Sequence, residues 1–181
     1  LEDQTPFQPC EGSDVTETMD VAQGKLCMGF TVPITNRDPR FPAMQALNVI
    51  FGSGMTSKLF MNVREKMSLC YSIGSGYYGT KGIAVVNAGI DFDKETLVKE
   101  EVLRQLQLCR EGEISQRELD SAKEALLSSL RSTHDSPGAL SGLAFSHSEY
   151  MKAVETLTVA DVVECAKIME LHTTYFLKGG S

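Results

Sequence analysis

Apolar and polar residues alternate along two stretches of the chain. In residues 83–90, alanine, valine and isoleucine occupy every other position, and a turn at Lys81-Gly82 joins this stretch to the glycine- and tyrosine-rich residues 71–80. A period of two is typical of a half-buried strand, so two neighbouring strands are predicted here. A third strand is predicted over residues 25–32, and residues 174–177 predict a last one. The apolar positions of residues 25–32 are Leu26, Met28, Phe30 and Val32.

Between the first two predicted strands along the chain, apolar residues recur at helical intervals. Asp38-Pro39 has the order of a helix start, and Gly52-Ser53-Gly54 ends that helix in a turn that favours residues with positive φ. A second short helix follows. Its apolar stripe consists of Leu59, Phe60, Val63 and Met67.

Four further helices are predicted after residue 93. The first runs from Asp93 to Gly112, and a capping box at Ser115 and Glu118 begins the second. Residues 136–151 predict a third, because Ser-Pro opens them. The last begins at residue 158, where a threonine precedes an aspartate by three positions.

The predicted order is one strand, two helices, two strands, four helices and one strand. Segregated strands and helices indicate an α+β fold, with a mostly antiparallel sheet and helices packed on one face. Residues 1–20 are polar and irregular and are interpreted as a lead-in linker, and residues 21–181 as a single domain. The chain begins at Leu1 and ends in Gly-Gly-Ser, which suggests a fragment of something longer.

Composition narrows the possible partners. The 181 residues carry 17 Lys and Arg against 24 Asp and Glu, a net charge of −7. Nucleic acids and anionic membranes bind proteins through clustered positive charge, so neither is expected as a partner of this acidic chain. The five cysteines are scattered and form no Cys-x-x-Cys, which favours reduced thiols and a cytoplasmic location.

Most catalytic motifs are absent from the sequence. The three histidines, His134, His147 and His172, have no pair one helical turn apart, so surface or structural roles are favoured over a metal site. The glycine turn after residue 51 lacks the third glycine of a dinucleotide-binding loop and the lysine of a phosphate-binding one. Asp91 and Asp93 lie at a strand-to-helix junction, where helix capping is the expected role.

Arg64 and Tyr71 are the candidate site residues. Arg64 lies off the apolar stripe of its helix, and Tyr71 begins a strand that contains Gly74 and Gly76. A guanidinium and a phenol at one helix-to-strand junction form a pair of donors suited to a peptide carbonyl or a developing oxyanion. Residue type alone also allows the alternative that Arg64 is an ordinary arginine on the helix surface and Tyr71 a structural tyrosine.

Residues 52–66 and the following Leu69-x-Tyr71 resemble a family motif. They are similar to the small-residue turn, the "Ser-x-Leu-Phe-x-x-Val-Arg-Glu-Lys" helix and the "Leu-x-Tyr" of the C-terminal, zinc-free domain of M16 metallopeptidases, the pitrilysin, insulinase and mitochondrial processing peptidase family. Residues 157–162 resemble the family's "Leu-x-x-Val-Thr-x-x-Asp-Val" helix entry, with a different order of Thr and Val. Residues 175–179 resemble its closing strand.

The resemblance implies one half of a two-half enzyme around a closed chamber. No cofactor is expected in this chain, which lacks His-x-x-Glu-His, and the zinc is expected on a homologous partner half. Arg64 would hold the backbone of a peptide substrate, and Tyr71 would donate to the tetrahedral oxyanion. The isolated chain is expected to be inactive and to associate with its partner half, or with itself as a dimer. The alternative is a catalytically silent M16-like subunit that acts as a scaffold.

Overall fold

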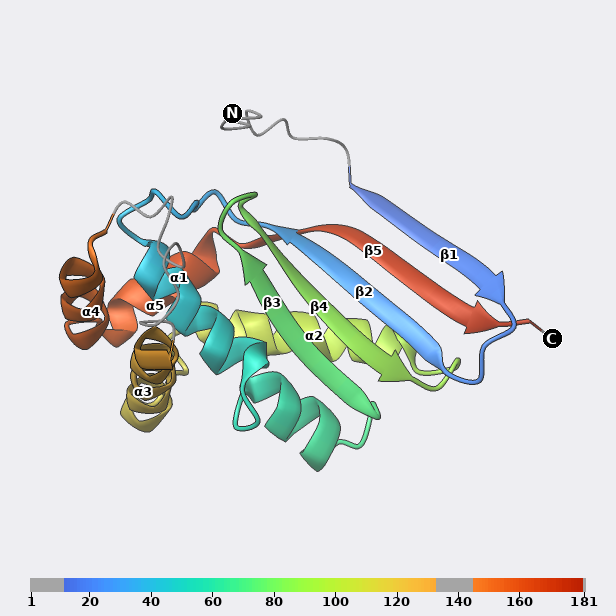
Figure 1. Cartoon of the computed structure of the whole chain (residues 1–181). Coiled ribbons are helices and arrows are strands. Elements are labelled where there is room, and N and C mark those ends of the chain that lie inside the picture. The colour runs from blue at the N-terminus through green and yellow to red at the C-terminus, as the bar shows by residue number, and fades with distance from the viewer. Residues whose placement is uncertain (1–11, 133–144, 181) are drawn as a thin grey trace.

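The computed structural model describes residues 12–132 and 145–180 of the chain. One five-stranded sheet forms its centre, in the order β1-β5-β2-β4-β3 (Figure 1). All neighbouring strands are antiparallel except β1 and β5. The α+β fold predicted from the sequence is confirmed. The strands are β1 Ser13–Met19, β2 Gly24–Thr31, β3 Ser72–Tyr78, β4 Ile83–Ile90 and β5 Glu170–Gly179.

The helices share one hydrophobic core with one face of the sheet. Strand residues Met28, Phe30 and Phe176 are almost fully buried, and so are Val98 and Leu106 of α2. In Figure 1, α2 passes behind the strands, so the opposite face of the sheet lies toward the viewer. The helices are α1 Phe41–Asn48, η1 Val49–Ser53, η2 Leu59–Lys66, α2 Glu95–Arg110, α3 Gln116–Ser132, α4 His147–Glu155 and α5 Val159–Lys167.

The two predicted capping boxes at α3 and α5 are present. The amide of Glu118 donates to the Ser115 hydroxyl over 3.0 Å, and the Ser115 amide donates to the Glu118 carboxylate over 3.1 Å. Thr158 and Asp161 make the same reciprocal pair at α5. The helix predicted over residues 136–151 is wrong at residues 145–146, because α4 begins at His147 and the extended Ser146 caps it through Glu149. The predicted start at residues 136–137 lies outside the described part of the chain.

The prediction of an irregular lead-in linker over residues 1–20 is wrong for residues 13–19, which form β1. Residues 13–19 form a strand whose seven residues are all exposed, and each pairs with a residue of β5. Two side-chain contacts hold β1: Lys99 Nζ of α2 lies 3.5 Å from Asp14, and the Tyr175 hydroxyl of β5 donates to Glu17 over 2.8 Å. Because polar, solvated residues carry no hydrophobic alternation, the local pattern did not reveal this strand.

The apolar stripe expected on η2 is also only partly correct. Leu59 and Val63 are fully buried, but Phe60 is half-buried and Met67, just after the helix, is exposed. η2 is a π-type helix, whose wider turns move residues at ordinary helical spacing around its surface. No helix in the described residues is both long and apolar enough to cross a bilayer.

Candidate functional site

Arg64 lies in the last turn of η2, at the boundary between the core and solvent. Leu59 and Val63 anchor the helix in the core, and Arg64 follows them at the surface. Its guanidinium carbon lies 4.8 Å from the centre of the Phe60 ring, within range of a cation–π interaction. One guanidinium nitrogen also forms an ion pair with Glu65 over 2.7 Å. The side chain is therefore positioned by its own helix.

A tight reversal after η2 brings Tyr71 back to Arg64. Ser68 has a φ of 53°, and it is the one non-glycine residue with positive φ in the described ranges. The amide of Leu69 donates to the Val63 carbonyl over 3.0 Å, which closes the end of the helix. The chain then passes beside the helix, where Arg64 Nε donates to the backbone carbonyl of Tyr71 over 2.8 Å. The seven-residue spacing thus corresponds to one helix end and one turn.

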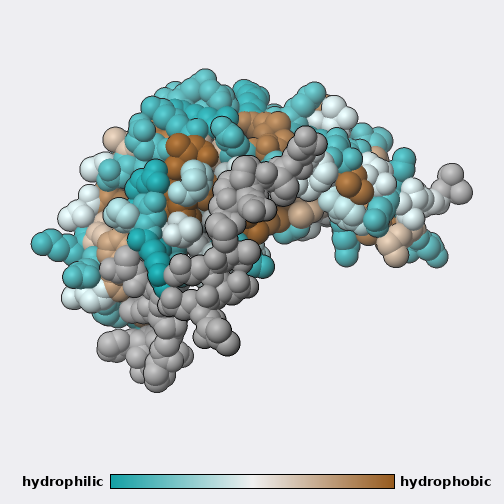
Figure 2. Space-filling view, turned by 90° about the horizontal axis from the view of Figure 1, so that it is seen from above, coloured by the Kyte–Doolittle hydropathy of each residue, from teal (hydrophilic) through white to brown (hydrophobic). Residues whose placement is uncertain are grey.

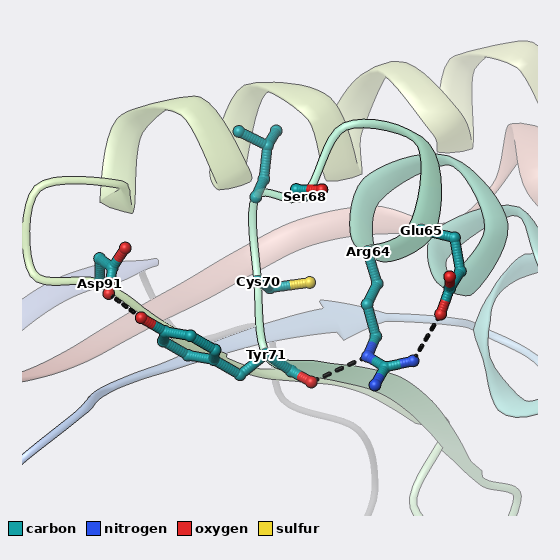
Figure 3. Close-up of a pocket in the computed structure, with 7 residues that line it drawn as sticks. Arg64, Glu65, Ser68, Cys70, Tyr71 and Asp91 are labelled. Atoms are coloured by element: carbon teal, nitrogen blue, oxygen red, sulfur yellow. Dashed lines mark hydrogen bonds and ion pairs between the residues drawn. The ribbon is translucent and has the colours of Figure 1, made fainter.

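The phenol of Tyr71 points away from the guanidinium. Its hydroxyl donates to the Asp91 carboxylate, which follows β4, and Figure 3 shows the ring directed to that side. The side chain is 55% exposed. The hydrogen bond to Asp91, together with the negative charge of that carboxylate, raises the pKa of Tyr71. The structure therefore brings Arg64 and Tyr71 together as residues, while their side-chain donors have separate partners.

A hollow of about 340 Å³ opens between these residues and is lined by Arg64, Glu65, Ser68, Leu69, Cys70, Tyr71 and Asp91. Burial raises the pKa of the Cys70 thiol to about 11, so this thiol is uncharged near neutral pH and a poor nucleophile. The chemistry available is hydrogen-bond donation from a guanidinium and a phenol. To donate to a ligand, the Tyr71 hydroxyl has to exchange its bond to Asp91 for one to that ligand.

Asp91 has a different role from the helix cap that its position in the sequence predicted. Its carboxylate receives the Tyr71 phenol, whereas the residue preceding α2 is Lys94, whose side chain makes no capping bond. The helix-cap interpretation is therefore wrong for Asp91. The pairing of β3 with β4 brings Asp91 to Tyr71. Ser72 pairs with Gly89, so Tyr71 before β3 and Asp91 after β4 lie close to each other.

The glycine turn between η1 and η2 has a different cause from the one expected. Gly52 does not have a positive φ, and Gly54 is extended with a φ of −93°. A Cβ atom at Gly52 would lie 2.4 Å from the Ser75 hydroxyl and 2.8 Å from Leu59. Gly52 is thus required because η1 packs closely against β3.

The described part of the chain contains no group of three or more His, Cys, Asp or Glu residues that could hold a metal ion. His147 begins α4, and His172 lies in β5 with its Nδ1 2.6 Å from the Thr173 hydroxyl. His134 lies outside the described residues.

This domain is similar to one known protein family over most of its length. The model of the "Peptidase M16 inactive domain" matches residues 2–126. The chain belongs to the M16 inactive-domain family. A relative from Bacillus subtilis, "Probable inactive metalloprotease YmfF", is 30% identical over 188 residues, covering 99% of this chain and 44% of its own length. An "Uncharacterized zinc protease" of Rickettsia bellii is 28% identical over 81% of the chain and 38% of its own length.

Solved structures agree with this membership. A conserved protein from Enterococcus faecalis has a TM-score of 0.89 and 30% identity, covering 97% of this chain and 44% of its own. An M16 inactive domain from Pseudomonas fluorescens, at 22% identity and a TM-score of 0.79, shares the fold. This M16 chain therefore spans less than half the length of each of these four relatives.

Proposed function

We propose that this M16 domain is the half of a zinc metalloendopeptidase that does not bind zinc, and that it supplies Arg64 and Tyr71 to a peptide-hydrolysing site on another domain or subunit. The observation that carries the proposal is the placement of a guanidinium and an exposed phenol around one open hollow. Such donors can hold a peptide carbonyl and stabilise the oxyanion that forms when water attacks it.

The roles of the two residues follow from how each is held. Arg64 is fixed by the Tyr71 carbonyl, Glu65 and the Phe60 ring, so it suits binding of a substrate backbone. Tyr71 is exposed and held at its hydroxyl by one carboxylate. Its hydrogen bond can move from Asp91 to a developing negative charge. The zinc and the water-activating glutamate belong to the partner half in this proposal.

A second candidate function is a catalytically silent subunit that assembles or positions partners. Two observations favour it: the printed name of the Bacillus subtilis relative, which describes a probable inactive metalloprotease, and the engagement of the Tyr71 hydroxyl with Asp91. In this case Arg64 and Tyr71 are structural, and their replacement changes no turnover.

Reconstitution separates the two candidates. The chain is mixed with a homologous M16 half that carries His-x-x-Glu-His. Hydrolysis of an unstructured peptide is then measured for the mixture and for each half alone. The first proposal expects hydrolysis that depends on both halves and on Tyr71. Hydrolysis that is unaffected by Tyr71→Phe and Arg64→Ala, in an assembly that still forms, contradicts the first proposal and supports the scaffold.

A further inference from the structure

The face of the sheet opposite the helices contains a second hollow, of about 450 Å³. It crosses four neighbouring strands. Tyr175 of β5 pairs with Cys27 of β2, which pairs with Asn87 of β4, which in turn pairs with Gly74 of β3. These four residues form one row across the sheet. Lys25 and Leu177 lie in the adjacent row of the same hollow.

Two glycines on this face are not required by the fold. A Cβ atom built on Gly74 would have the Gly52 carbonyl oxygen as its nearest neighbour at 3.7 Å, and one on Gly29 would lie 3.8 Å from Thr173. Both are ordinary van der Waals distances. Neither glycine has a positive φ, so the register shift between β2 and β5 next to Gly29 does not need a left-handed residue.

Gly82, in contrast to Gly29 and Gly74, is a glycine that the fold requires. It has a φ of 64°, and a Cβ atom there would lie 2.7 Å from the Val32 carbonyl oxygen, so the turn between β3 and β4 requires glycine. Glycine in a strand loses more conformational entropy on folding than other residues and packs no side chain. In strands it often marks a place where a ligand or another backbone approaches closely. Gly74, which lines the hollow, fits that role, because among the described residues only the Gly52 carbonyl oxygen comes within 4 Å of a Cβ built there. Gly29 lies on the same face of the sheet, outside the lining of the hollow.

We propose that this hollow binds an extended polypeptide segment that crosses β5, β2, β4 and β3 and places an acidic residue beside Lys25. Adjacent strands lie about 4.8 Å apart, so the row spans about 14 Å, the length of about four extended residues. The inference rests on the proposed function, since it places part of the peptide substrate on this domain.

The positive charge of Lys25 is the reason to expect an acidic residue in the bound peptide. Lys25 is the one charged residue that lines it, and this exposed side chain forms no ion pair within residues 12–132 and 145–180. The rest of the lining is neutral. A single cation in a neutral trough, on a chain with a net charge of −7, favours a segment with one carboxylate over a basic one.

The hollow also adjoins the Arg64–Tyr71 pocket. Ser72 and Gly89 line its edge, and the amide of Tyr71, the next residue, donates to the Gly89 carbonyl over 2.8 Å. A segment that follows the row of Lys25 across to Ser72 therefore leaves the hollow next to Tyr71. This continuity allows one peptide to contact both places.

The first test examines whether the glycines are free to change. Gly74→Val and Gly29→Val are expected to keep the melting temperature of the chain or to raise it by about 2–4 °C, the range that a small gain in stability produces in a domain of this size. Gly82→Val, as a contrast, should lower it. A clear fall in melting temperature for Gly74→Val overturns the inference, because the fold itself would then require that glycine.

The second test measures binding directly. Two ten-residue peptides of alanine, serine and valine are compared, one with a pair of glutamates and one with a pair of lysines. The chain's amide resonances are followed up to millimolar peptide. The glutamate peptide should shift the signals of Cys27, Asn87 and Gly89, and Gly74→Val should weaken binding at least tenfold. Lys25→Glu should reverse the preference. Gly54→Val, which adds the same bulk outside the hollow, should leave binding unchanged.

Other outcomes overturn the inference or separate it from the proposed function. If neither peptide shifts these signals at millimolar concentration, the hollow is not a peptide site. If the chain self-associates in sedimentation and Gly74→Val abolishes this, the occupant is a second copy. In the reconstituted assembly, a loss of turnover with Tyr71→Phe but unchanged peptide binding with Gly74→Val refutes the hollow alone. The reverse pattern refutes the proposed function alone.

Discussion

The two faces of the central sheet belong to the same strands but differ in what they carry. Toward the helices, Leu26, Met28 and Phe30 of β2 are buried, whereas Lys25 and Cys27 on the other face are exposed or half-buried. The buried face contributes apolar area to the core, and the open face presents glycines, a cation and the approach to Tyr71. Stability and candidate function are therefore separated by a single residue step along each strand.

The surface supports this separation. Viewed from above in Figure 2, the molecule is mainly hydrophilic, and its apolar residues lie in separate patches. Exposed apolar side chains do occur at several sites, including Met55, Met61, Tyr78 and Phe92. A partner half is therefore expected to recognise this domain through mixed polar and apolar contacts.

The largest effect is expected from neighbouring residues of β5 that point to opposite faces. Phe176 is 1% exposed, and Phe176→Ala should lower the free energy of unfolding by about 3–5 kcal/mol because it leaves a cavity. Tyr175→Ala, on the open face, should cost well under half of that. Urea unfolding of both variants measures the difference. Equal losses would mean that the open face is also covered in solution.

Turnover in the reconstituted assembly gives the next largest effect. Tyr71→Phe should lower kcat by about ten- to a thousandfold with a smaller change in KM, because only a hydrogen bond to the oxyanion is lost. Its melting temperature should stay close to that of the wild type, since the side chain is exposed. Intact turnover with a melting temperature many degrees lower would make Tyr71 a structural residue.

Arg64→Ala should act mainly on KM in the same assembly. Holding a substrate backbone is largely ground-state binding, so its loss is expected to raise KM about tenfold or more with a smaller effect on kcat. Arg64→Lys keeps the charge but loses the planar guanidinium, and it should recover only part of the affinity. An Arg64→Ala variant with wild-type KM and a lowered kcat would assign the oxyanion role to the arginine instead.

A smaller effect concerns the titration of Tyr71. Its pKa is raised above the ordinary value of 10.0 by the bond to Asp91. A raised pKa in the folded state contributes stability that is present below pH 10 and is lost as the pH rises through the folded pKa. Asp91→Asn should therefore lower the pKa of Tyr71 toward 10, measured by tyrosinate absorbance with Tyr71→Phe as the blank. An unchanged titration in Asp91→Asn would show that the hydrogen bond does not persist in solution.

The smallest expected effect is none at all. The isolated chain should retain no stoichiometric zinc after dialysis and should hydrolyse no unstructured peptide, because its sequence lacks His-x-x-Glu-His. Metal analysis and a peptide assay measure both. Zinc retained at one equivalent, and lost on replacing His134, His147 and His172, would contradict the assignment of the metal to a partner half.

Local patterns predicted much of this fold. Residues 25–32 and 83–90 formed strands because their alternation matches the pleat, and the capping boxes at α3 and α5 were found from short-range spacing. The pairing of Arg64 with Tyr71 could also be predicted, since one helix end and one turn separate them. The orientation of the phenol could not, because its partner Asp91 belongs to the next strand.

The sequence by itself determined the α+β class, the capped starts of α3 and α5, the turn at Gly82 and the M16 resemblance of residues 52–71, because each depends on residues close together in the chain. Only the tertiary structure decided that β1 joins β5, some 160 residues away, since its exposed residues carry no hydrophobic signal. It also decided that Gly52 is required by packing while Gly74 is not. Both depend on which elements meet across the sheet, and long-range neighbours leave no periodic pattern in the chain.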